Sequence, residues 1–324
     1  MSGLVGHSIY GLLGLKEAQR RGSKVINAAR LHLGSYLAGA YIGSDIQTMP
    51  EAICVETGRE VGYGTVPLDK SPLTDGPVKP FTLATPEGQL SPKDVHTRFY
   101  GRAHLVFGWG LREKSLRVPW DHLADYFAAV WEDIHMLPGD LMRQQAYVLG
   151  WIAHVVGDSL IKSIQPGVQL KLLDGAYTPR NRPIQDLYAF HEVGVNELAT
   201  DWLQLFRSMA ESPVEAVQSH YMRCTHMSGH LGKLFPDGWL PESEATLKVV
   251  LKENRRWLAQ HAKDVLSDME LTNGSCRASL RELAGLDYPE MKQLASDAGL
   301  RQVLDYIATE IASMIDAMEV RLKR

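Results

Sequence analysis

The chain has 324 residues, of which 45% are hydrophobic and 22% charged, a balance typical of a globular protein with one large domain or two small ones. A net charge of −4 and the lack of a basic stripe exclude the usual nucleic-acid binder, so no long nucleic acid is expected as a substrate. No apolar run reaches the roughly 20 residues needed to span a bilayer, so no transmembrane segment is expected. The three widely spaced cysteines form neither a disulfide framework nor a metal knuckle, which favours a reducing, cytoplasmic location.

Apolar residues at helical spacing dominate the chain, and most interruptions fall at glycine or proline. The exception is the stretch 48–95, whose prolines, glycines and short β-like runs predict a long irregular excursion that can include a hairpin. We expect this excursion to shape the mouth of a pocket. The predicted fold class is therefore all-α, a multi-helix bundle with one irregular excursion. The predicted helices cover residues 4–21, 24–42, 120–135, 141–164, 184–208, 214–234, 242–269, 276–283, 288–298 and 300–323.

The most informative pair of residues is His154 and Asp158, four positions apart in the predicted helix 141–164. Residues at this spacing project from the same face of a helix. An imidazole nitrogen and a carboxylate oxygen placed together can hold a divalent metal such as zinc. A lone buried aspartate is costly, so its partner must be a metal ion or a basic side chain. A buried His–Asp pair without metal is the alternative interpretation.

Three further residues are candidate metal ligands from other elements. His7 lies near the start of the first helix, Asp45 follows the second helix, and His104 stands in an aromatic stretch. Their side chains suit zinc, and zinc ions about 3.5–4 Å apart would suit phosphoester hydrolysis. Each also has a simpler explanation. Asp45 can terminate a helix, His7 can be a half-buried histidine, and His104 can be core packing.

The order of these residues resembles that of the zinc-dependent phospholipase C and S1/P1 nuclease superfamily, over roughly residues 5–200. The resemblance implies a helical bundle with three zinc ions. It also implies a zinc-dependent, phospholipase C-like hydrolase that acts on a small phosphoester or a phospholipid headgroup. Its most specific part is a His-x-x-x-Asp motif with glycine before the aspartate and Gln-Pro shortly after. The matching residues are His7, Asp45, His104, His154-Val155-Val156-Gly157-Asp158 and Gln165-Pro166.

The resemblance also implies a set of ligands. Asp45, His104, His154 and Asp158 would hold one zinc, and Asp158 would bridge to a second zinc that also uses His7. Asp45 would be the general base or the group that orients the attacking water.

The third zinc site of that family is matched less well. The family has a histidine two residues after Gln-Pro, where this chain has Val168, and a His-x-x-x-Glu motif on the next helix. The nearest match here is Tyr188 to Glu192, with His191 beside the glutamate. One to three zinc ions are therefore expected, with His191 and Glu192 as the candidate ligands of the third.

Other functions remain open at this point. Glu132 and His135 form an ExxH motif typical of di-iron oxygenases, although such bundles need two motifs and the chain has one. A non-catalytic helical binding protein with a degenerate metal site is another alternative. A second histidine group, His220 to His230, is a polar helix face or a separate metal site. Residues 1–210 are predicted to form the metal-binding domain, and residues 211–324 an extension that packs on the same bundle or forms a homodimer contact.

Overall fold

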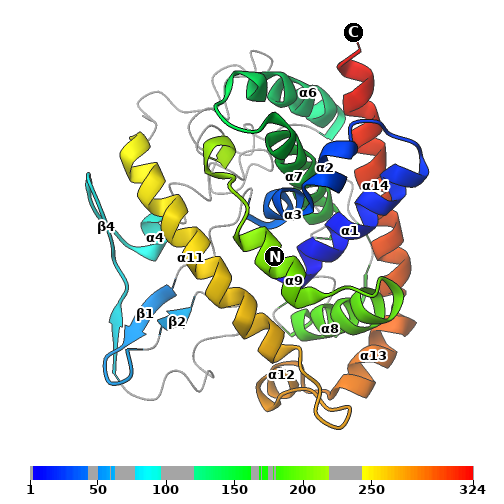
Figure 1. Ribbon diagram of the computed structural model, residues 1–324. Helices are drawn as coiled ribbons and strands as arrows, with labels where there is room; N and C mark the ends of the chain where they lie inside the picture. Colours follow the sequence, from blue (N-terminus) through cyan, green and yellow to red (C-terminus); the bar gives the residue numbers. More distant parts are fainter. Residues whose placement is uncertain are drawn as a thin grey trace.

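A computed structural model shows a bundle of helices with two small antiparallel sheets at one side (Figure 1). The predicted all-α class is therefore confirmed. Within the described ranges, no helix is both long enough and apolar enough to cross a bilayer. The structure describes residues 3–42, 50–58, 60–62, 77–95, 120–161, 168, 170–173, 178, 180–218 and 243–323.

Three helices meet at the centre of the bundle: α1 (Leu4–Arg20), α3 (Leu33–Ile42) and α7 (Leu141–Ile161). Each of the three contacts the other two. Every side chain of α7 from Ala146 to Ile161 is buried, as expected for a helix surrounded by others. This central position explains why the predicted helices 4–21 and 141–164 are rich in apolar residues.

Glycines allow α3 and α7 to approach each other closely. Gly150 of α7 faces the backbone of α3, where an added Cβ would overlap the carbonyl oxygen of Tyr36 and lie 2.8 Å from the amide nitrogen of Ala40. Gly39 of α3 faces the carbonyl oxygen of Tyr147 in the same way. The two backbones are therefore in contact, and this crossing fixes the position of Ala40 against α7.

The prediction of one continuous helix over residues 24–42 is wrong. The segment is divided into α2 (Asn27–Leu31) and α3, because His32 leaves the helical region with φ −127° and ψ 55°. Just after the break, Gly34 packs against the Ser208 carbonyl of α9 (Trp202–Ala210) and the Ser212 hydroxyl just beyond that helix. The apolar pattern continues through this break, so periodicity alone does not reveal it.

The predicted helix 184–208 is also divided. α8 (Arg182–Tyr188) continues into a π-helix, η8 (Ala189–Glu197), and the chain then turns at Ala199, whose φ is 52°. It resumes as α9 (Trp202–Ala210), whose N-cap Asp201 accepts a hydrogen bond from the Gln204 amide at 3.0 Å. The turn lets the Trp202 ring pack directly on Gly194. This tertiary contact is favourable enough to offset the cost of the interrupted helix.

The described part of the excursion forms two small sheets and contains the expected hairpin. The hairpin of β4 (Leu83–Thr85) and β5 (Gly88–Leu90) packs with Phe81 and Val95 against α11 (Glu244–Asp268). Together they form a hydrophobic cluster that also contains Leu247 and Trp257. The other sheet has the strand order β2-β1-β3. A role for the excursion at a pocket mouth stays a prediction. Its elements are β1 (Pro50–Cys54), β2 (Glu60–Gly62), β3 (Val78–Pro80), β4 (Leu83–Thr85), β5 (Gly88–Leu90) and α4 (Pro92–Val95).

The C-terminal helices share a core with the N-terminal ones. α14 (Leu300–Arg321) packs against α1, α7 and α6 (Leu123–Asp133), and buried residues of all four belong to one hydrophobic cluster. The described part of residues 211–324 thus lies on the bundle, whereas a domain boundary near residue 210 stays a prediction. The remaining elements are η6 (Trp120–His122), η7 (Ile134–Met136), α11 (Glu244–Asp268), α12 (Ala278–Ala284) and α13 (Tyr288–Asp297).

The cap of α13 predicts a pH-dependent contribution to stability. Asp287 accepts hydrogen bonds from the amides of Cys276 (2.9 Å) and Tyr288 (2.7 Å), and these amides hold the pKa of its carboxyl well below the usual range. A lowered pKa stabilises the fold above the unfolded value of about 4, and the stabilisation is lost as the pH falls through the folded value. We expect Asp287→Ala to lower the melting temperature at pH 7 and the difference from wild type to shrink below pH 4. A difference in melting temperature between the variant and wild type that stays constant from pH 7 to pH 3 would contradict this.

Candidate metal centre

Three side chains from two central helices meet inside the bundle: His7 of α1, and His154 and Asp158 of α7. All three are 0% exposed. Nε2 of His7 lies 3.6 Å from Oδ1 of Asp158, and Nε2 of His154 lies 3.6 Å from Oδ2 of the same carboxylate. Their ligand atoms all lie within 4.8 Å of one another. Among the residues that the structure describes, these three side chains form the one cluster of potential metal ligands.

The orientation of His154 is fixed from α3. Its Nδ1 lies 2.9 Å from the carbonyl oxygen of Ala40, and because a carbonyl can only accept, Nδ1–H must donate. In the neutral imidazole this leaves a lone pair on Nε2, the nitrogen that faces Asp158. A backbone carbonyl commonly fixes the tautomer of a metal-binding histidine in this way.

The electrostatics of the group favour a cation between its members. A separation of 3.6 Å is too long for a hydrogen bond. It is close to the separation of about 3.3 Å between two atoms bound tetrahedrally to one zinc ion at about 2.0–2.1 Å. The rings of His7 and His154 are stacked, with centroids 4.2 Å apart and planes 9° apart. Two imidazolium ions would repel each other in this arrangement, whereas two neutral imidazoles are the form that binds metal. The three residues can therefore hold a metal ion.

Aromatic side chains enclose His7. The rings of Tyr10 and Tyr41 stand edge-on to it, with centroids 5.9 Å and 6.0 Å away. Tyr10 packs on Gly157, where an added Cβ would lie 2.6 Å from its Cδ2 atom. This contact explains why a glycine precedes Asp158, because a larger residue would push Tyr10 and α1 away from α7.

Two of the predicted ligands, Asp45 and His104, lie outside the described residues. Their roles, including that of Asp45 as general base, stay predictions. In sequence, Asp45 follows the last residue of α3 by three positions. α3 is also the helix that brings Ala40 and Tyr41 to the group.

The structure does not bring His191 and Glu192 into this group. The His191 Nε2 atom lies 2.8 Å from the carbonyl oxygen of Met269. The Glu192 carboxylate accepts a hydrogen bond from the Tyr288 hydroxyl at 2.6 Å and forms an ion pair with Lys292 at 2.8 Å. The π-helical turns of η8 direct both side chains toward α13 and the end of α11. The expectation that they bind metal beside His154 is therefore not supported.

The di-iron interpretation does not fit the geometry either. Glu132 and His135 are exposed, and Nδ1 of His135 donates a hydrogen bond to the carbonyl oxygen of Trp131 at 2.9 Å. In di-iron bundles the ligands of an ExxH motif project inward. The second histidine group, within residues 220–230, lies outside the described residues.

Comparisons of the chain with protein families, with curated proteins and with solved structures find no match. The resemblance to the phospholipase C and S1/P1 nuclease superfamily therefore rests on the residues themselves. Sequence reasoning missed the parts of the centre that come from other helices, such as the Ala40 carbonyl and the Tyr41 ring. A backbone carbonyl carries no sequence signal, and Tyr41 stands in no motif.

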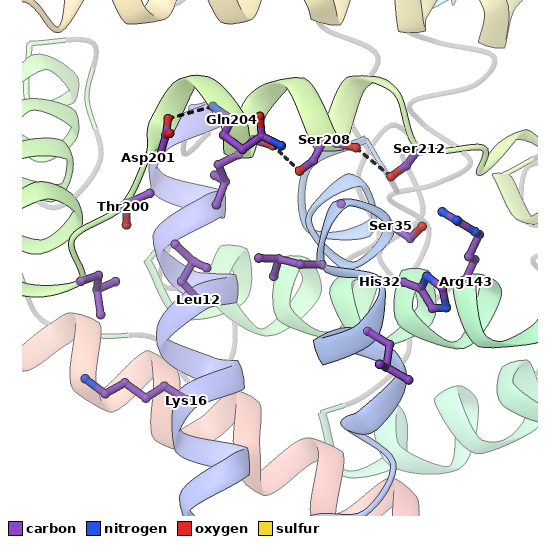
Figure 2. A pocket seen from close by; sticks show the side chains of 15 residues that line it. Leu12, Lys16, His32, Ser35, Arg143, Thr200, Asp201, Gln204, Ser208 and Ser212 are labelled. Atoms are coloured by element: carbon purple, nitrogen blue, oxygen red, sulfur yellow. Dashed lines mark hydrogen bonds between the residues drawn. The ribbon is translucent and has the colours of Figure 1, made fainter.

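A separate recess of about 710 Å³ lies between α1, the junction of α2 and α3, and α9 (Figure 2). Leucines and small hydroxyl side chains line it, together with charged residues such as Lys16, Arg143 and Asp201. Arg143 stands eleven positions before His154 on α7, which corresponds to about 16 Å along the helix axis. The recess is therefore distinct from the metal-binding group.

Proposed function

We propose that this protein is a zinc-dependent hydrolase of phosphoesters, similar to the phospholipase C and S1/P1 nuclease superfamily. The observation that supports it most strongly is the buried group of His7, His154 and Asp158. Two helices that are far apart in sequence supply the donor atoms expected from the resemblance. The residues fit zinc in donor type, in separation and in the tautomer of His154.

Each residue of the group has a defined task in this proposal. Bound zinc supplies a water with a pKa of about 7 and offsets charge on a phosphoryl oxygen. Asp158 provides the negative charge that retains the ion, and the Ala40 carbonyl keeps Nε2 of His154 available as a donor. Tyr10 and Tyr41 surround His7 and limit the access of bulk water. Asp45, by resemblance, orients the attacking water and accepts its proton.

Metal analysis combined with an activity assay tests this function. We expect the purified or zinc-reconstituted chain to hold at least one zinc ion and to hydrolyse phosphodiester or phosphomonoester model substrates. His154→Ala should reduce zinc affinity more than about 100-fold, since it removes a direct ligand and not merely a supporting contact.

His135→Ala is the matched control, because it removes an exposed histidine outside the group and should leave zinc content and activity unchanged. Absence of bound metal from both native and zinc-reconstituted wild type would reject the proposal.

Complete burial of the three ligands favours a second candidate, a non-catalytic protein with a structural metal. Catalytic zinc sites keep an open coordination position, whereas structural sites are closed. All three side chains here are 0% exposed. A folded, zinc-bound chain that is destabilised by chelators but inactive on a broad panel of phosphoesters would favour this candidate over the hydrolase.

A further inference from the structure

Arg182 lies next to the turn of α1 that carries His7. Gly3 and His7 are four positions apart, so they share one face of α1, about 6 Å from each other. An added Cβ on Gly3 would lie 3.0 Å from Nη2 of Arg182 and 3.1 Å from Oδ2 of Asp186, the partner of Arg182 in an ion pair. The guanidinium of Arg182, at the start of α8, therefore covers the same face of α1 about one helical turn from the histidine.

Two ring contacts and one electrostatic effect also place Arg182 near the metal-binding group. The ring of Tyr41 stands edge-on to His7 and stacks on His261 of α11, with centroids 6.4 Å apart and planes 13° apart. Burial and, secondarily, the positive charge of Arg182 lower the pKa of His261 to about 4. Arg182 is thus close enough to His261 for its charge to be felt, and His261 is neutral at pH 7.

The guanidinium of Arg182 has hydrogen-bond donors to spare. Its side chain is 19% exposed, and its buried Nε atom has no hydrogen-bond partner. The carboxylate oxygen that forms an ion pair with it, Oδ2 of Asp186, is 3.6 Å away, which is too long for a hydrogen bond. Burial also raises the pKa of Asp186, although Arg182 opposes this shift. An arginine cannot give up its charge, so these partly buried donors favour an anionic ligand.

We propose that Arg182 forms an anion subsite beside the metal centre and binds two non-bridging oxygens of a phosphate ester. This inference rests on the proposed function, because it assigns the subsite to the same substrate. A guanidinium matches phosphate with two parallel hydrogen bonds and stabilises charge on the transferred group. The competing explanation is a purely structural ion pair between Arg182 and Asp186.

Calorimetry with inorganic phosphate tests the subsite on the zinc-loaded full chain. We expect Arg182→Gln to keep the zinc content of wild type and to weaken phosphate binding about 10- to 100-fold, the effect of losing hydrogen bonds to a charged group. Arg143→Gln is the matched control. It removes an arginine that, like Arg182, forms an ion pair with an aspartate nearby in sequence, here Asp140 just before α7, and it should leave phosphate affinity unchanged.

A second variant keeps the arginine and displaces it. Gly3→Ala places a methyl group against Nη2 of Arg182 at an N-cap position whose φ of −71° alanine readily adopts. It should weaken phosphate binding by less than Arg182→Gln while retaining zinc. If Arg182→Gln misfolds, a phosphate affinity of Gly3→Ala equal to that of wild type overturns the subsite.

The two proposals fail separately. Equal phosphate affinity of folded, zinc-loaded Arg182→Gln and wild type would overturn the subsite and leave the metal centre intact. A wild-type chain that binds no zinc would overturn the proposed function. If that metal-free chain binds phosphate and Arg182→Gln weakens this binding, the subsite is still supported.

Discussion

Asp158→Asn is expected to abolish metal binding and hydrolysis together. The carboxylate of Asp158 is the single negative charge of the group, and its two oxygens face the Nε2 atoms of both histidines. The asparagine amide has the same size and shape as the carboxylate but carries no charge. It would present to the ion either its NH2 group, which is a hydrogen-bond donor, or its neutral oxygen, which is a weaker ligand. We expect zinc affinity to fall more than about 100-fold. For the proposed hydrolase, activity should fall at least about 1000-fold, because the metal would supply several kcal/mol of stabilisation to the transition state.

The effect of a chelator on the melting temperature distinguishes a metal centre from a metal-free His–Asp network. A ligand present at 1000 times its Kd stabilises the fold by about 4 kcal/mol, so wild type should melt at a clearly lower temperature after chelation. Asp158→Asn should melt at the same temperature with and without chelator.

Glu319→Gln is the control, because it converts another buried carboxylate, one that contacts Ser23 and Lys24 away from the group, and should retain zinc. Equal zinc content in Asp158→Asn and wild type would show that the group is not the metal site.

Gly150→Ala is expected to cause the largest loss of stability. Its methyl group would overlap the backbone of α3 at Tyr36 and lie 2.8 Å from the Ala40 amide nitrogen, and backbone atoms cannot rotate away as a side chain can. Alanine is favoured over glycine in a helix by about 1 kcal/mol, but separating two packed helices costs more. We expect a net loss of about 3 kcal/mol or more in the free energy of unfolding, measured by urea denaturation. Zinc affinity should also fall, because the Ala40 carbonyl would move away from His154.

Gly11→Ala is the matched control at another crossing with α3. Its added Cβ would lie 3.2 Å from Cε1 of Tyr36 and 3.3 Å from Cδ2 of Leu37, which are side-chain atoms that can shift by a few tenths of an ångström. The gain in helix propensity then offsets the crowding, and stability should change by less than about 1 kcal/mol. Equal losses for the two variants would mean that the approach of α3 to α7 does not depend on Gly150.

The sequence by itself determined most of the helices and the most local part of the site. Apolar periodicity defined α1, α7 and α14 because one face or all faces of each helix are buried. The spacing of His154 and Asp158 placed both side chains on one face of α7, since helix geometry alone sets that relation.

The tertiary structure decided everything that depends on how helices pack together. The meeting of His7 with Asp158, the Ala40 carbonyl on His154 and the position of Arg182 over α1 come from contacts between elements. The breaks at His32 and Ala199 have the same origin, because the packing of α9 on Gly34 and of Trp202 on Gly194 outweighs local helix propensity. Packing also directed His191 and Glu192 away from the group, since their partners lie on α13 and at the end of α11. Short-range periodicity contains no information about such partners, because they are distant in sequence.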